Sequence, residues 1–439
     1  MTSADTIFAP ASGPGRSAVA VVRISGRDSG PALSALVGGA LPPPRRAVVR
    51  RLVRPGTGEA IDQALVLWLP APGSFTGEDV AEVHCHGGLA VRAAILGALS
   101  GMNGLRAAEP GEFTRRAFLN GRMDLSEVEG LSDLIEAETE AQRRQALRQM
   151  DGALSRPVMN WRERLLDAAA LLESYLDFAD EEDIPSSVDR AGFDELTAVR
   201  AEVEAALAGA VRGERLRDGF AVVIAGPPNA GKSTLLNAFA QRDVAIVSPH
   251  AGTTRDAIEV RCDLGGLPVL FIDTAGWRDT EDPVERVGIE RARERAASAD
   301  LVLWLDPGDA ADRAFPPERM PILRVRTKVD VAGNGPSDHD AAVSAVTGSG
   351  METLIALVQG HAHDSMGGGD ALVTRERHRA ALSSVAECLA RAQEVYSAGQ
   401  VELAAEDVRL ALRALGRISG QVDVDEVLDR IFSRFCIGK

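Results

Sequence analysis

The sequence predicts a multidomain α/β protein: an N-terminal α+β domain, a discontinuous helical domain, and an inserted α/β domain with a mostly parallel sheet. Residues 1–120 mix short apolar runs with Gly and Pro breaks, as α+β domains do. Over 121–216, apolar residues recur three and four positions apart, which is the spacing of amphipathic helices. Strands and helices alternate over 217–365. Helical spacing returns over 366–439, so the helical domain is expected to be interrupted by the 217–365 domain.

Composition limits the partners and the compartment. The length of 439 residues fits about three domains. A net charge of −16 opposes general attraction to nucleic acid, so such a partner must be reached through a local patch or a second protein. The chain has no long uncharged apolar run and no basic-then-apolar N-terminus, so we expect a cytoplasmic protein without a membrane span. Its four cysteines lack paired spacing, which argues against disulfides and a zinc site.

A phosphate-binding loop is the clearest motif. Gly226 to Ser233, "GPPNAGKS", follows the apolar strand "AVVIAG" and precedes a helix. Glycines let backbone N–H groups curl around phosphate oxygens, and the helix N-terminus adds partial positive charge. Lys232 is expected to reach the β- and γ-phosphates as a catalytic group, and the Ser233 hydroxyl to bind Mg²⁺. The predicted nucleotide contacts of this loop are Asn229, Ala230, Gly231, Lys232, Ser233 and Thr234.

Two further motifs have the positions of switch loops. The strand "PVLFIDTAG" ends in Asp273, Thr274, Ala275 and Gly276, where Asp273 can support the Mg²⁺ shell and the Gly276 N–H can face a γ-phosphate. The stretch "GTTRD" lies between the two motifs, and its Thr254 is expected to bind Mg²⁺ when the loop closes.

The base is predicted to be guanine. Asp330 in "TKVD" can accept hydrogen bonds from guanine N1–H and N2–H₂, a donor pair that adenine lacks. Thr327 stands where Asn is usual, which predicts the loss of a tie within the loop and weaker nucleotide affinity. The expected base contacts are Thr327, Lys328, Asp330, Ser344 and Ala345. Together the motifs predict a Ras-like GTPase domain.

Two details narrow the type of GTPase. Trp277 follows Gly276, where many GTPases have a water-orienting Gln, so another group must position the water. No arginine finger is obvious, although Arg255 and Arg278 lie near the switches. The side-chain oxygen of Asn229 could hold a monovalent cation against the phosphates and supply the missing positive charge.

The chain resembles the bacterial and organellar MnmE (TrmE) family of tRNA-modifying GTPases over essentially its whole length. The residues that carry the resemblance include "DTIFAPASGPGRSAVAVVRISG", "GSFTGEDVAEVHCHGG", "RAAEPGEFTRRAFLNGRMDLSEVEGLSDLI", "GPPNAGKSTLLNAF", "AGTTRD", "DTAGWR", "VERVGIERA" and the terminal "CIGK". The stretches near the two ends are the specific ones, because many unrelated proteins share the P-loop.

The resemblance implies a K⁺-activated GTPase that works as a homodimer. With an MnmG-like flavoprotein it would form a heterotetramer and add a carboxymethylaminomethyl or aminomethyl group to C5 of the tRNA wobble uridine. The one-carbon donor would be a tetrahydrofolate derivative, in the 5-formyl or 5,10-methylene form. Residues 1–120 would then be the folate-binding and dimerisation domain.

Carried over by position, the resemblance implies roles for individual residues. K⁺ would be held by Asn229, Ser248, the backbone of His250, and Thr253; Ser248 and Thr253 would also contact the nucleotide. Glu285 would orient the attacking water. Folate would contact Arg23, Glu82, Arg122 and Lys439.

The C-terminal tail "RFCIGK" is apolar enough to dock. We expect the final helix to pack into the helical domain through Ile431, Phe432 and Phe435. This packing would place the last four residues, Cys436 through Lys439, near the folate site. The Cys436 thiol could attack C6 of the uracil ring as a catalytic nucleophile, or it could be a plain buried thiol.

Two functions from different classes fit the GTPase motifs. One is an RNA-modification enzyme, and the other is a regulatory switch GTPase of ribosome assembly. The N-terminal α+β domain and the docked tail favour the enzyme, because a pure switch would not need them.

Overall fold

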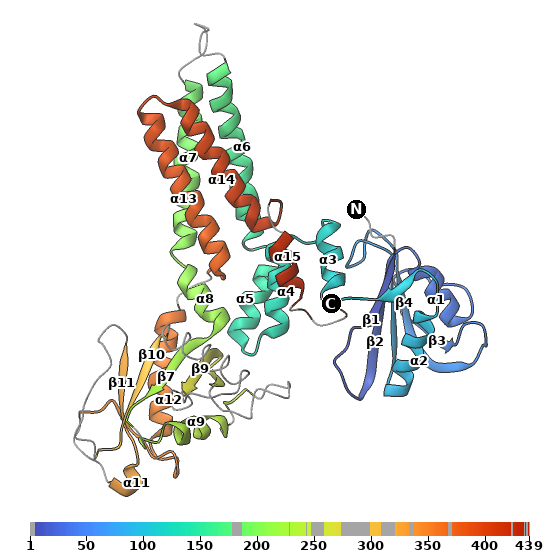
Figure 1. Ribbon diagram of the computed structural model, residues 1–439, viewed down its shortest axis with the longest axis horizontal. Coiled ribbons are helices and arrows are strands. Elements are labelled where there is room, and N and C mark those ends of the chain that lie inside the picture. Colours follow the sequence, from blue (N-terminus) through green and yellow to red (C-terminus); the bar gives the residue numbers. More distant parts are fainter. Residues whose placement is uncertain are drawn as a thin grey trace, which may run out of the picture. The chain divides into compact units, whose positions relative to one another are not determined.

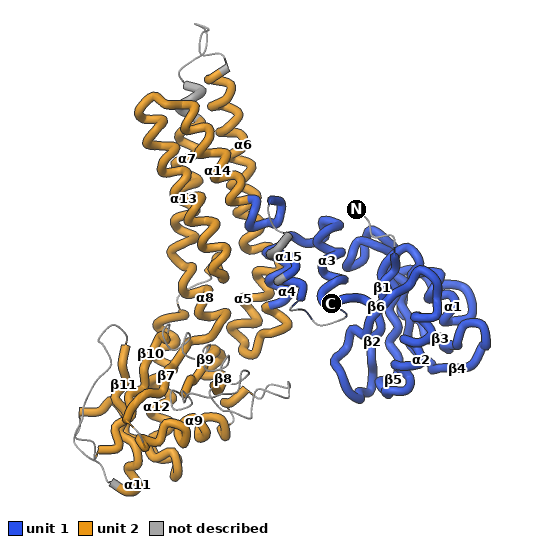
Figure 2. The backbone as a smooth tube through the Cα atoms, in the orientation of Figure 1, with its two compact units in different colours: residues 1–132, 416–439 blue, residues 133–415 orange. Residues whose placement is uncertain are grey.

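The computed structural model describes two compact units, which Figure 2 distinguishes by colour. They are Met1–Ser132 with Gly416–Lys439, and Asp133–Leu415. The described residues are 5–177, 187–227, 229–242, 244–246, 259–273, 299–308, 321–332, 338–367, 371–422, 425–433, 435 and 438. The predicted combination of an α+β domain, helices and a mostly parallel sheet is confirmed. The predicted domain limits remain predictions.

The first unit is built on a six-stranded sheet in the order β3-β4-β5-β2-β1-β6. Its strands are β1 (Thr6–Pro10), β2 (Ser17–Ser25), β3 (Val48–Val53), β4 (Ala60–Leu69), β5 (Val80–Gly87) and β6 (Leu105–Ala107). Only the β1–β6 pair is parallel. Because side chains alternate along a strand, Val22, Val66 and Val83 share one face, where α1 (Ser29–Val37) and α2 (Leu89–Ser100) cover them.

The C-terminal helix packs within this same unit. It is α15 (Asp425–Phe432), and it meets α3 (Glu112–Leu119) and the start of α4 (Leu125–Glu136). Phe432 and Phe435 are buried against Leu125 and Val128, and Ile431 packs at the edge of the cluster. The expected burial is confirmed for Phe432 and Phe435, whereas Ile431 is half-buried.

The second unit contains a bundle of long helices, which lie side by side in Figure 1. They are α6 (Ser155–Asp177), α7 (Ser187–Leu207), α13 (Glu376–Ser397) and α14 (Val401–Ser419). Ion pairs join them, such as Arg409 of α14 with Glu173 of α6 at 2.7 Å. The remaining helices that surround the sheet are α5 (Glu140–Met150), α8 (Ala210–Asp218), α9 (Lys232–Ala240), α11 (Val329–Ala332) and α12 (Met351–Met366).

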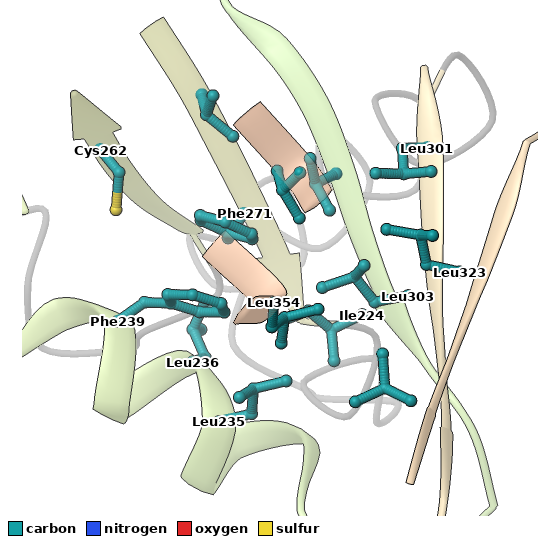
Figure 3. Packing of buried hydrophobic residues seen from close by; sticks show 14 of the residues in the cluster. Ile224, Leu235, Leu236, Phe239, Cys262, Phe271, Leu301, Leu303, Leu323 and Leu354 are labelled. Atoms are coloured by element: carbon teal, nitrogen blue, oxygen red, sulfur yellow. The ribbon is translucent and has the colours of Figure 1, made fainter. Parts of the chain in front are cut away.

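The sheet of the second unit has the order β12-β11-β10-β7-β9-β8. Its strands are β7 (Phe220–Ala225), β8 (Glu259–Leu264), β9 (Leu267–Asp273), β10 (Leu301–Asp306), β11 (Ile322–Arg326) and β12 (Ala341–Ala342). All pairs are parallel except β8–β9. Figure 3 shows the core beneath α9, where Phe239 stacks on Phe271 with ring centroids 4.0 Å apart. This packing fixes the helix that follows the P-loop.

Helix α5 holds the segments that lead into and out of this sheet. Its glutamines at positions 142, 145 and 149 donate side-chain hydrogen bonds to the carbonyls of Arg217, Gly213 and Leu372, at 3.0, 3.1 and 2.6 Å. Asp133 adds ion pairs with Arg217 and Arg375, on the same two segments. The inserted sheet is therefore fastened at both of its chain connections.

No described helix is both long enough and apolar enough to cross a membrane.

Candidate functional site

The P-loop lies between β7 and α9, at the carboxyl edge of the parallel sheet. Gly226 has φ +145°, and a Cβ there would come within 2.6 Å of the Leu305 carbonyl oxygen, so only glycine fits. Gly231 caps α9 with φ +93°, and Asn229 holds an exposed side chain at φ +60°. The loop therefore has the left-handed turns that a cradle of backbone N–H groups requires.

The predicted phosphate and magnesium groups converge at this loop. The Lys232 ammonium donates hydrogen bonds to the carbonyls of Gly226 and Pro227, both at 2.9 Å. The Ser233 hydroxyl donates to the Asp273 carboxylate at 2.6 Å. Asp273 is buried at the end of β9. The sheet thus brings together a hydroxyl and a carboxylate, which are the oxygen ligands that Mg²⁺ prefers.

The guanine loop is tied directly to the P-loop. The buried Thr327 hydroxyl donates to the carbonyl oxygen of Ala230 at 2.8 Å. The expectation that Thr327 loses the tie of the loop is therefore wrong, because its shorter side chain still reaches a P-loop carbonyl. Lys328 follows at φ +55°, and Asp330 is exposed in the first turn of α11, where a base can reach it.

The loop that carries Ser344 and Ala345 lies next to the loop that carries Thr327. The Val343 N–H donates to the Arg326 carbonyl at 2.7 Å, and the Val329 N–H donates to the Val343 carbonyl at 3.4 Å. Ser344 is buried, and its hydroxyl accepts from the Thr347 N–H at 3.2 Å. Ala345 is half-buried beside it. Backbone hydrogen bonds therefore join the loop that carries Ser344 to the loop that carries Thr327.

Several predicted residues lie outside the described residues, and their positions are not part of this geometry. They are Ser248, His250, Thr253, Thr254, Thr274, Ala275, Gly276, Trp277, Glu285, Cys436 and Lys439, together with Arg255 and Arg278 near the switches.

In the first unit, two residues that the resemblance assigns to folate face each other across neighbouring strands. Arg23 of β2 is in register with Glu82 of β5, and their side chains form an ion pair at 3.0 Å. The Arg23 guanidinium also lies over the rings of Phe75 and Phe113, at 5.6 and 5.8 Å from their centroids. Glu82 accepts a further contact from His84 at 3.1 Å.

Arg122 joins the same neighbourhood through the loop that carries Phe75. Its side chain packs against Gly77, and the Asn120 amide donates to the Thr76 carbonyl at 2.8 Å. Arg23 and Arg122 thus both contact the loop that carries Phe75, and Glu82 is joined to it through Arg23. Two aromatic neighbours, Phe75 and Phe113, were missed from the sequence, although Phe75 lies within the signature stretch "GSFTGEDV".

A network of charged side chains around the buried Arg116 holds this loop in place. Arg116 of α3 contacts Glu78 at 3.2 Å, Asp5 at 3.0 Å and Glu112 at 3.1 Å. Glu78 in turn accepts from the Ser25 hydroxyl at 2.7 Å, at the end of β2. The charge of Arg116 is therefore compensated, and the loop is fixed to β2 and α3.

The tail reaches the end of β1. Gly438 is buried with φ +97°, and a Cβ there would overlap the Pro10 carbonyl oxygen. Pro10 pairs with Val22, the neighbour of Arg23. Gly438 is thus held next to the strand that pairs with the Arg23 strand.

Comparison with known proteins then identifies the family. The family model described as the MnmE helical domain matches residues 125–436, and the model described as the N-terminus of the GTP-binding protein TrmE matches residues 6–122. The chain belongs to the MnmE family. The resemblance seen in the sequence is confirmed.

Curated MnmE relatives match along the whole chain. A tRNA modification GTPase MnmE from Methylorubrum populi is 59% identical over 99% of this chain and 98% of that protein. The MnmE of Methylobacterium radiotolerans is 57% identical over 100% of both chains. Among solved structures, a GTP-binding protein from Sulfolobus solfataricus is 15% identical over 46% of this chain and 67% of that chain, with a TM-score of 0.23, too low to support an inference.

The tie between the loops predicts a role for Thr327 in nucleotide affinity. Thr327→Val keeps the shape but leaves the buried Ala230 carbonyl without its donor, which costs about 1–3 kcal/mol. We expect GDP binding, measured with a fluorescent analogue, to weaken on the order of tenfold or more. Thr327→Ser, which keeps the hydroxyl, should bind like the unaltered chain. Equal affinity for the Val and Ser variants would show that the tie is dispensable.

The tail contact predicts a specific need for glycine at 438. Gly438→Ala should detach the tail, because the new Cβ meets the Pro10 carbonyl. Hydrogen exchange of the Phe435 amide should then rise by tenfold or more, measured by mass spectrometry. Gly56→Ala is the control, since Gly56 has φ +86° with nothing within 4 Å. Similar exchange at Phe435 in both variants would contradict the contact.

Proposed function

We propose that this chain is a K⁺-activated GTPase that acts with an MnmG-like flavoprotein to modify C5 of the tRNA wobble uridine, using a folate one-carbon donor. The added group is carboxymethylaminomethyl or aminomethyl. The main support is the hydrogen bond between Thr327 and Ala230, which joins the P-loop to the predicted guanine loop. In addition, the curated relatives that match along the whole chain are named tRNA modification GTPases.

Nucleotide binding is proposed to use the residues around the P-loop. Backbone N–H groups of the loop donate hydrogen bonds to the phosphate oxygens, and the Lys232 ammonium exchanges its contacts with the Gly226 and Pro227 carbonyls for contacts with phosphate oxygens. Asp330 reads the guanine edge. Ser233, supported by Asp273 and joined by Thr254, is proposed to hold Mg²⁺, which neutralises phosphate charge when it is bound.

The water and the cation complete the proposed hydrolysis site. Glu285 is proposed to orient the attacking water, as the family resemblance implies, since Trp277 stands where many GTPases have the orienting Gln. Asn229, with Ser248, Thr253 and the backbone of His250, is proposed to hold K⁺, which supplies the positive charge of an arginine finger when it is bound. The exposed Asn229 side chain, at a left-handed turn of the loop, is compatible with that role.

The modification site is proposed to lie in the first unit. Arg23, Glu82 and Arg122, with Lys439 of the tail, bind the folate. The exposed ring of Phe75 beside Arg23 offers an apolar wall for a flat pterin ring, and the buried ring of Phe113 supports the Arg23 guanidinium from the core. Cys436 is either the nucleophile that attacks uracil C6 or a structural thiol. The working assembly is proposed to be a homodimer that binds the flavoprotein as a heterotetramer and receives tRNA.

The cation site predicts a difference between salts. GTP hydrolysis should be stimulated by K⁺ and hardly by Na⁺, and Asn229→Ala should remove the difference. Because Asn229 has φ +60°, Ala also strains the backbone, so Asn229→Gly is the matched control without strain. If the Gly variant kept the K⁺ response that the Ala variant lost, strain and not the amide oxygen would be the cause.

The proposed function is tested by analysing wobble uridine in tRNA from cells that lack this protein. The C5 modification should disappear and return with the full-length chain. Deletion of residues 436–439 should leave it absent while GTP hydrolysis stays near normal. Cys436→Ser should behave like the deletion only if the thiol is chemical. Normal wobble uridine together with defective ribosomes would instead support a switch GTPase.

A further inference from the structure

A run of arginines in the first unit has no role in the site described above. Between Asp28 and Glu59 the sequence contains no Asp or Glu, yet it carries five arginines. They are Arg45, Arg46, Arg50, Arg51 and Arg54, and we call them the arginine edge. Such a local excess of positive charge is unusual in a chain of net charge −16.

The fold places this run at the border of a sheet. Arg50 and Arg51 lie on β3, which is the outermost strand and pairs only with β4. Arg45 and Arg46 precede the strand, and Arg54 follows it. Arg46 and Arg51 are exposed, and within the described part of the chain neither makes an ion pair.

Arg45 and Arg54, which lie outside the strand, are only weakly engaged. Arg45 donates to the Gly73 carbonyl at 2.8 Å, and Arg54 pairs with Glu59 at 3.3 Å, with both side chains of that pair largely exposed. Exposed pairs of this kind contribute little to stability. The edge therefore keeps most of its charge available to a partner.

Protection of an edge strand is the simplest alternative explanation. Charged side chains on an outer strand prevent sheet-to-sheet aggregation. That accounts for Arg50 and Arg51, but not for Arg45, Arg46 and Arg54 outside the strand, nor for the absence of acidic residues from the sequence between Asp28 and Glu59.

We propose that the arginine edge binds the phosphate backbone of tRNA, an inference that rests on the proposed function. Guanidinium groups match phosphate with paired hydrogen bonds. A chain of net charge −16 needs a local patch to hold a polyanion. Residues 41–58 contain no aromatic side chain, so the anchors typical of a protein interface are missing.

The distance to the candidate modification site fits this partner. Val49, Leu65, His84 and Val21 form one row across the sheet, and Arg51 and Arg23 lie two residues beyond its two ends, on the same face. Three strand spacings and about four residues along the strands give a separation of roughly 20 Å. A few nucleotides of RNA can span that distance.

The test measures binding of an unmodified tRNA transcript to the full chain at several potassium acetate concentrations. We expect Arg46→Gln with Arg51→Gln to weaken binding about tenfold and to reduce the salt slope by roughly 1.4–1.8, since two phosphate contacts are lost. GTP hydrolysis should be unchanged. The control is Arg27→Gln with Arg144→Gln, which removes the same charge from two side chains that are each 71% exposed.

Four results would overturn the inference. The first is that the Arg46 and Arg51 variant binds tRNA as tightly as the unaltered chain. The second is that the control variant loses as much affinity for tRNA as this variant does, which would indicate an effect of overall charge alone. The third is that the variant still binds tRNA but no longer binds the flavoprotein, which would assign the arginine edge to a protein partner. The fourth is that the unaltered chain fails to bind tRNA at any salt concentration. If that chain still restores wobble modification in cells, the proposed function survives and only this inference fails.

Discussion

The fastening of the inserted sheet by α5 is the constraint on which the second unit depends. A domain inserted into a helical bundle is joined to it by two chain crossings, and each crossing leaves backbone carbonyls to satisfy. Gln142, Gln145 and Gln149 donate to carbonyls on both crossings. Each such bond contributes about 0.5–1.5 kcal/mol, and a buried carbonyl left without a donor would cost more. The sheet therefore has a defined position on the bundle.

The fastened segment leads directly into the nucleotide site. Helix α8 ends at Asp218, β7 follows at Phe220, and the P-loop begins at Gly226. Helix α5 also meets the turn between β8 and β9, where the Ala141 N–H donates to the Gly266 carbonyl at 3.1 Å. Strand β9 ends at Asp273, the partner of Ser233. The same helix thus contacts segments that lead to both halves of the phosphate site.

The nucleotide site was largely predictable because its chemistry is local. A glycine-rich loop between a strand and a helix has few possible structures, so "GPPNAGKS" predicted the cradle from spacing alone. Thr327 was the exception. Its substitution for Asn predicted a missing tie, but the acceptor is Ala230, 97 positions away, and no local pattern indicates that distance.

The first unit was less predictable from its residues. Arg23 and Glu82 carry no motif of their own, and only the family resemblance joined them; their pairing depends on the register of β2 and β5. Phe75 and Phe113 come from a loop and a helix that meet only in the folded unit.

By itself, the sequence determined the fold class, the glycine turns of the P-loop and the burial of Phe432 and Phe435, because these depend on periodicity, glycine spacing and apolar content over short stretches. The assignment of the guanine-reading loop stays a prediction. The tertiary structure decided which distant groups meet: Thr327 with Ala230, Arg23 with Phe75 and Phe113, Gly438 with Pro10, and the arginines of β3 at an open edge. The physical reason is that strand order and register are set by the packing of the whole unit, and residues far apart in the chain come together only once that packing exists.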